Sequence, residues 1–143
     1  MNVKAILAAK GGDIVSIEPT ATLSAAAKIL RERRIGALVI RGAGGRLSGI
    51  LSERDIVRTV AEHGADALTL PVAQVMTRNV MTCAENDTVS DIMEQMTAGK
   101  FRHLPVVHEG RLVGLVSIGD VVKQHVEEIE RESEAMRDYI RSA

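Results

Sequence analysis

The feature that most constrains the fold is an internal duplication, because one string of residues occurs twice along the chain. Segments 44–60 (GGRLSGILSERDIVRTV) and 109–125 (EGRLVGLVSIGDVVKQH) share G-R-L-x-G, two apolar residues and then Ser-x-x-Asp. Ser52 and Asp55 of the first copy therefore correspond to Ser117 and Asp120 of the second, 65 residues later. We expect two related repeats.

The correspondence continues upstream through further elements in the same order. Residues 16–30 align with 82–96, and 35–40 align with 101–106, at an offset of 66. The offset falls by one inside RGAGG (41–45), where the first repeat has an extra turn residue. Agreement over several consecutive elements indicates duplication of a whole structural unit.

Each repeat is predicted to run strand, helix, strand, strand, helix. The first helices should begin near Thr22 and Thr88, since each threonine precedes apolar residues at helical spacing. ALVI and HLPVV read as strands, and GAGG and HEG as turns between strands. This alternation predicts an α/β class, an α+β sandwich, with both repeats sharing one core. The expected boundaries are 1–65 for repeat 1, 66–79 for a linker with a short helix after its proline, 80–125 for repeat 2 and 126–143 for a C-terminal helix.

Composition argues against several classes of function. The formal charge is -1, with 18 basic and 19 acidic residues, so broad binding to nucleic acid or to a membrane surface has no electrostatic support. Aromatic residues are 1% of the chain, which disfavours stacking on single-stranded nucleic acid. A single cysteine and the lack of a long apolar run predict a cytoplasmic protein without a membrane span.

The Ser-x-x-Asp motif supports two readings. In the first, the serine caps a helix and the acid favours its first turn. In the second, the pair binds a ligand: the helix N-terminus and the serine hydroxyl suit a phosphate, and the carboxylate can accept two ribose hydroxyls. Both roles can coexist, so both readings stay open.

Other polar residues show no catalytic pattern. The histidines and Cys83 lack metal-ligand spacing, and Cys83 has no evident histidine partner. The glycines of GAGG (42–45) lack the P-loop pattern and suit a hairpin turn. We therefore expect no enzyme activity, no catalytic residues, no metal and no catalytic cofactor.

The tandem repeat, with G-apolar-apolar-S-x-x-D ending each copy and HLPV (103–106) before the second, resembles a pair of cystathionine β-synthase (CBS) domains, the Bateman module. The resemblance covers about residues 1–125 and suggests a stand-alone CBS-pair protein. It implies two pseudo-symmetric β-α-β-β-α repeats packed through their sheets, usually in a disc-shaped homodimer. It also implies a regulatory sensor of an adenine nucleotide or related ligand (AMP, ATP, NAD or S-adenosylmethionine), with an unknown regulated partner. The alternative is a dimerisation or partner-binding scaffold without a ligand.

The resemblance also implies two crossed clefts, in which the acid of one repeat faces the strands of the other. The first would join Ser52, Arg54 and Asp55 to Thr77, Val80, Met81, Arg102 and His103. The second would join Ser117 and Asp120 to Lys10, Ile14, Val15, Gly36 and Ala37. Because arginines and a histidine gather in the first set, we expect that cleft to prefer phosphorylated ligands.

The end of the chain carries a further pattern. Val122, Val126, Ile129, Ser133, Met136 and Ile140 are spaced 4, 3, 4, 3 and 4 residues apart, with charged residues on either side. Such a heptad stripe indicates a helix that either docks on its own domain or pairs with another subunit or a partner. Ser133 weakens the stripe, which argues against a long, stable coiled coil.

Overall fold

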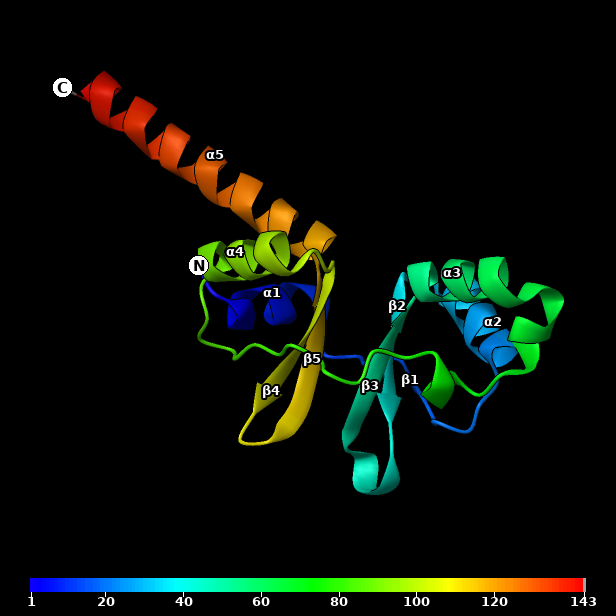
Figure 1. Ribbon diagram of the computed structural model, residues 1–143. Coiled ribbons are helices and arrows are strands. Elements are labelled where there is room, and N and C mark those ends of the chain that lie inside the picture. The colour runs from blue at the N-terminus through cyan, green and yellow to red at the C-terminus, as the bar shows by residue number, and fades with distance from the viewer. Residues whose placement is uncertain (143) are drawn as a thin grey trace. The chain divides into compact units, whose positions relative to one another are not determined.

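The computed structural model describes residues 1–142, which form two compact units (Figure 1). Unit 2 is residues Asp13–Met81, and unit 1 combines residues 1–12 with the chain from Thr82 onward. The sequence placed residues 1–12 with the first repeat, whereas in the structure they pack with the second. Each unit therefore contains one repeat together with the segment that precedes the other repeat in the chain.

Unit 2 is a three-stranded sheet with helices packed on it. Strand β2 pairs in parallel with β1 and antiparallel with β3, so the order is β1-β2-β3. One helix, α2, supplies Leu23, Ala26 and Leu30 to the apolar cluster that also includes strand residues. The elements are β1 (Ser16–Ile17), α2 (Leu23–Arg33), β2 (Ala37–Arg41), β3 (Leu47–Ser52) and α3 (Glu53–His63), with 3₁₀ turns η1 (Ala43–Gly45), η2 (Gly64–Thr69) and η3 (Val72–Gln74).

Unit 1 has the same plan around an antiparallel hairpin. The first strand of the repeat is reduced to a single parallel bridge between Cys83 and Val106, with Cys83 N–H donating to the Pro105 carbonyl at 2.9 Å. The elements are α1 (Val3–Lys10), α4 (Val89–Gly99), β4 (His103–His108), β5 (Arg111–Ser117) and α5 (Ile118–Ser142).

The predicted helix starts are confirmed. Thr22 caps α2 by accepting from the Ala25 N–H at 3.1 Å, and Thr88 caps α4 by accepting from the Asp91 N–H at 3.1 Å. A side-chain acceptor at this position satisfies an N–H group that the helix itself leaves unpaired. The duplicated threonines thus mark equivalent helix starts in the two repeats.

Each repeat packs against the segment that precedes the other repeat in the chain, so the two segments are exchanged between the repeats. Val72, which lies before the second repeat, donates its N–H to the Ala21 carbonyl of the first at 2.8 Å. Val3, which lies before the first repeat, donates to the Asp87 carbonyl of the second at 2.9 Å. Both valines are fully buried, so each repeat buries the segment that precedes the other one.

The glycines of the repeated G-R-L-x-G string leave room for these exchanged segments. A Cβ on Gly49 would lie 2.6 Å from the Met76 sulfur and 2.7 Å from the Thr77 carbonyl oxygen. A Cβ on Gly114 would lie 2.5 Å from a methyl carbon of Leu7 on α1. The motif glycine is therefore needed for close approach in both repeats.

Buried apolar side chains form one cluster in each unit. The single core that the sequence predicts for both repeats stays a prediction. In unit 2 the cluster is Leu23, Ala26, Leu30, Leu38, Ile40, Leu51, Ala67 and Val72. In unit 1 it is Val3, Ile6, Cys83, Val89, Ile92, Met96, Leu104, Val106, Val116 and Val121. Each exchanged segment supplies apolar side chains to its host cluster, which is why each unit has a core of its own.

Candidate functional site: two Ser-x-x-Asp motifs

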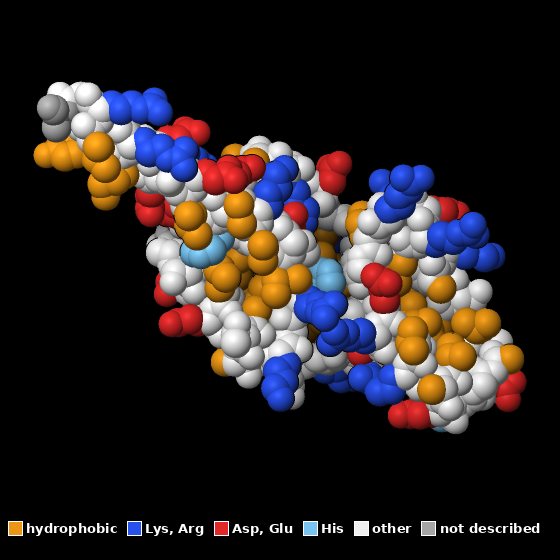
Figure 2. Space-filling view, turned by 90° about the horizontal axis from the view of Figure 1, so that it is seen from above, with side chains coloured by type: hydrophobic (Ala, Val, Ile, Leu, Met, Phe, Trp, Pro, Cys, Tyr) orange, Lys and Arg blue, Asp and Glu red, His pale blue; other side chains and the backbone are white. Residues whose placement is uncertain are grey.

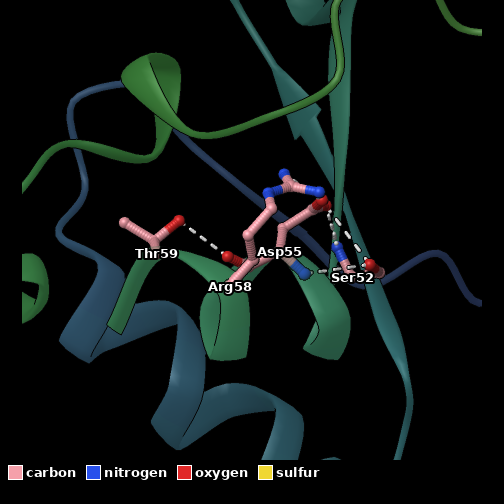
Figure 3. Close-up of polar contacts among 4 residues, drawn as sticks. All are labelled: Ser52, Asp55, Arg58 and Thr59. Atoms are coloured by element: carbon pink, nitrogen blue, oxygen red, sulfur yellow. Dashed lines mark hydrogen bonds and ion pairs between the residues drawn. The ribbon is translucent and has the colours of Figure 1, made fainter. Parts of the chain in front are cut away.

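The first Ser-x-x-Asp motif joins β3 to α3 (Figure 3). The Asp55 N–H donates to Ser52 Oγ at 3.4 Å, and Asp55 Oδ2 accepts from the Ser52 N–H at 2.9 Å and from its hydroxyl at 3.2 Å. These reciprocal bonds are a complete capping box. The capping role read from the sequence is therefore confirmed for Ser52.

Asp55 is held from two further directions. Arg58 Nη2 donates to Asp55 Oδ1 at 2.9 Å, and the Thr59 hydroxyl donates to the Asp55 carbonyl oxygen at 2.7 Å. Asp55 is only 7% exposed, whereas the Arg58 side chain is 60% exposed. The carboxylate is thus a rigidly placed acceptor whose one cationic partner can move into solvent.

The second motif joins β5 to α5 in the same way. Asp120 Oδ2 accepts from the Ser117 N–H at 2.9 Å, and the Asp120 N–H donates to Ser117 Oγ at 3.2 Å. The cation differs: Lys10 at the end of α1 donates to Asp120 Oδ2 at 2.7 Å and to the Leu115 carbonyl at 2.7 Å. Lys10 therefore connects α1 both to β5 and to Asp120.

The contacts of Asp120 set its protonation. Burial alone raises the pKa of this carboxyl, but hydrogen bonds from Lys10 and Ser117 and the lysine charge outweigh burial and hold the pKa below its usual value. Asp120 is consequently ionised at neutral pH. It lines a cavity of about 140 Å³ within unit 1, together with Ile6, Ala9, Lys10, Lys123 and Gln124.

Within each unit, the motif lies beside the strand start of its own repeat. Ala37 pairs with Ser52, and the Gly36 carbonyl accepts from the Glu53 N–H at 3.0 Å. Likewise His103 pairs with Ser117, and the Arg102 carbonyl accepts from the Ile118 N–H at 2.8 Å. The crossed clefts that the resemblance implies join residues of different units and stay a prediction.

The remaining expected site residues, apart from Arg102 of unit 1, lie in unit 2. Thr77 forms an isolated antiparallel bridge with Ile50 of β3, the strand that leads into the first motif, donating its N–H at 2.9 Å and accepting at 3.1 Å. Met81 is 58% exposed. The expected residues Arg54 and Arg102 are exposed, while Ile14, Val15 and Val80 are partly buried.

Sequence reasoning missed Arg58 and Thr59. The signal was present, because residues three and four positions after Asp55 lie on the same face of a helix. In the second repeat these positions are Lys123 and Gln124, and the acid is instead paired with Lys10. The two motifs therefore have identical caps and different cations.

The structure offers little for other chemistry in residues 1–142. Burial raises the pKa of the Cys83 thiol to about 12, helped by the charge of Asp87, so Cys83 is protonated at neutral pH. Among these residues we find no group of three or more His, Cys, Asp or Glu side chains able to hold a metal ion. None of the described helices is both long and apolar enough to cross a membrane.

Comparison with known families identifies the family to which the chain belongs. The model of the CBS domain matches residues 3–62 and again residues 72–127, which together make up most of the chain. The two matches coincide with the two repeats, and the fold and the paired capping motifs agree with them. The chain belongs to the CBS domain family, as a tandem pair.

Individual relatives are CBS-domain proteins. A CBS-domain-containing protein of Agrobacterium tumefaciens is 47% identical, with a TM-score of 0.84, and the match covers 85% of this chain and 91% of that one. The CBS domain pair of protein MJ0100, solved in complex with 5′-methylthioadenosine and S-adenosyl-L-methionine, is 29% identical, with a TM-score of 0.78 and coverage of 90% and 98%.

An uncharacterized 17.7 kDa protein of Acidianus ambivalens is 36% identical over 108 residues, which are 75% of this chain and 64% of that protein. The chain also spans only part of two CBS domain-containing proteins of Arabidopsis thaliana. It covers 22% of the length of CBSCBSPB1 and 60% of the length of CBSX3.

Proposed function

We propose that the chain is a regulatory module that binds an adenosine-containing ligand and changes its dimer or partner contacts when the ligand binds. The observation that carries the proposal is the duplicated helix N-terminus, in which a serine hydroxyl and a fixed carboxylate stand beside a strand start. The proposed ligand class is that of the adenine nucleotides AMP, ATP and NAD, with S-adenosylmethionine beside them.

The adenosine part of the ligand is the best-supported element. Protein MJ0100 was solved with two compounds that share adenosine and lack phosphate. A carboxylate can accept both hydroxyls of a ribose, so Asp55 and Asp120 are the proposed ribose acceptors. A phosphate, where present, would lie at the N-terminus of α3 beside Ser52 and Arg54.

The two motifs should differ in how readily they accept a ligand. At Asp55 the Oδ1 atom accepts from Arg58, whose side chain is 60% exposed and can move into solvent at small cost. At Asp120 a ligand that competes for Oδ2 must displace Lys10, which also donates to the Leu115 carbonyl. We therefore infer stronger binding at the Ser52–Asp55 motif.

A ligand can regulate only by binding two conformations with different affinities. In unit 1 the candidate moving part is α1, because Lys10 connects it to Asp120. A ligand that takes the place of Lys10 would release the end of α1 from the motif.

The test is calorimetric titration of ligand-free protein with AMP, ATP, NAD and S-adenosylmethionine. Asp55→Asn and Asp120→Asn keep the shape and remove the charge. We expect Asp55→Asn to weaken binding about tenfold or more, since hydrogen bonds to a charged acceptor are the strong ones. Asp91→Asn is the matched control, because Asp91 has the same place in a capped helix, α4, outside the proposed site.

One observation favours the second candidate function, a scaffold that binds no ligand. Both motifs form reciprocal caps, which by themselves account for a serine and an acid at this spacing. If none of the four ligands binds, while Asp55→Asn still folds and loses only the stability expected of a helix cap, the scaffold is the better description.

A further inference from the structure

Helix α5 continues well past the part that packs on unit 1. Val121 and Gln124 are buried, whereas every described residue from Ile129 onward is exposed. The exposed part of the helix projects away from α1 and α4 (Figure 1). At 1.5 Å per residue, residues 127–142 extend roughly 24 Å. These residues gain little from packing on unit 1, so pairing of their apolar face with a partner would stabilise them.

The exposed part of α5 carries an apolar seam. Five of its side chains are exposed although they are large and apolar: Val122 (44%), Val126 (46%), Ile129 (51%), Met136 (62%) and Ile140 (66%). With Ser133 they alternate at steps of four and three residues, the repeat of a two-stranded left-handed coiled coil. Figure 2 shows apolar side chains along one edge of the projecting helix and charged side chains toward the opposite edge.

We propose that this seam, residues 122–140, pairs in parallel and in register with the same seam of a second copy of the chain. The residues that flank the seam indicate the relative orientation of the two helices. In a parallel pair, the residue just before Val126 or Ser133 faces the residue five places later on the other helix. Glu132 then meets the partner's Arg137, and His125 meets the partner's Glu130. Each pair occurs twice, by symmetry.

The antiparallel arrangement covers the same seam but opposes like charges. Pairing Val122 with Ile140 and Val126 with Met136 brings Glu130 against its own copy and Glu132 against its own copy. It also places Lys123 against Arg137. Since like charges across such a seam are unfavourable, the charge pattern selects the parallel pair.

Ser133 is compatible with this arrangement. It lies at the middle of the seam, between Ile129 and Met136, and meets its own copy in the parallel pair. A small polar residue at one such position lowers stability and fixes the register. The pair is therefore expected to be a modest, reversible dimer.

The first test is sedimentation equilibrium of the ligand-free 143-residue chain. The double variant Ile129→Asp with Met136→Asp should raise the dimer Kd at least about a hundredfold, because four apolar side chains are lost per dimer. The matched control, Arg131→Asp with Ala135→Asp, adds the same two residues away from the seam and should leave the Kd within about threefold. A monomeric wild type, or a double variant that dimerises as the wild type does, overturns the proposal.

Charge reversal tests the orientation. Arg137→Glu should weaken a parallel dimer, since it faces Glu132, and adding Glu132→Arg should restore it. In the antiparallel arrangement Arg137→Glu would strengthen the dimer, because it faces Lys123. Met136→Cys should form a disulfide dimer on mild oxidation only when the helices are parallel, while Cys83, 5% exposed, stays out of the reaction. A strengthened Arg137→Glu dimer, or no Met136→Cys disulfide, overturns the parallel pair.

The proposal requires no nucleotide. It is tested by the Kd of the ligand-free chain, whereas the ligand proposal is tested by calorimetry on the Ser-x-x-Asp motifs. Failure of one therefore leaves the other standing.

Discussion

Replacing Asp55 by alanine isolates the structural value of the first motif. The substitution removes the acceptor of the Ser52 N–H at 2.9 Å, of the Ser52 hydroxyl at 3.2 Å and of Arg58 Nη2 at 2.9 Å. The Ser52 side chain remains and still caps the helix. The variant therefore tests the acid half of the capping box.

The magnitude follows from burial. Loss of a charged acceptor for the part-buried Ser52 groups costs about 2 kcal/mol. The bond from Arg58 adds about 0.5 kcal/mol at most, because that side chain is 60% exposed and screened. Alanine is the better helix former by about 0.5 kcal/mol, which offsets the Arg58 term. The net expectation is destabilisation by about 2 kcal/mol.

The assay is urea unfolding of ligand-free protein, followed by circular dichroism at neutral pH. Asp55→Asn keeps one acceptor oxygen and should lose about 1 kcal/mol. Asp91→Ala, in the exposed N-terminal turn of α4, should lose about 0.5 kcal/mol or less. An Asp55→Ala protein as stable as the wild type would refute the reasoning, since the buried carboxylate would then stabilise nothing.

Three further predictions follow from local geometry. Lys10→Met should lower stability at neutral pH, as urea unfolding at several pH values would show. Because Lys10 helps to hold the folded pKa of Asp120 below its unfolded value of 3.8, the part of the loss that comes from Asp120 should disappear as the pH falls through the lower, folded value, whereas the part that comes from the Leu115 carbonyl should remain. Gly49→Ala should cost about 1–3 kcal/mol by calorimetry, because its Cβ meets the Thr77 carbonyl oxygen, whereas Gly12→Ala meets nothing within 4 Å and should cost far less. Cys83 should resist thiol reagents at pH 8 until urea unfolds unit 1, and rapid labelling of the folded protein would contradict its burial and its pKa of about 12.

Much of the fold was predictable because its signals are local. Thr22 and Thr88 precede apolar residues at helical spacing, so the caps and the starts of α2 and α4 could be placed from the sequence. The duplicated string ending in Ser-x-x-Asp predicted where the second helix of each repeat begins. The resemblance built on these repeats is confirmed by the match to the CBS domain.

The candidate site was predictable only in part. The capping bonds of Ser52–Asp55 and Ser117–Asp120 connect residues three apart, so their spacing alone indicates them. Lys10 was named only because the chain resembles a CBS pair, since its contact with Asp120 spans 110 residues. The crossed clefts and the ligand remain predictions.

The sequence by itself determined the duplication, the class of the fold, the helix caps and the apolar seam at the end of the chain. Each depends on a repeat or on a short-range spacing, which the order of residues contains directly. Only the tertiary structure decided that each repeat buries the segment preceding the other, through Val3 and Val72. The tertiary structure also decided which cation meets each acid and why a side chain at Gly49 or Gly114 would crowd its neighbours. These outcomes depend on packing between residues far apart in the chain, and no local pattern records that packing.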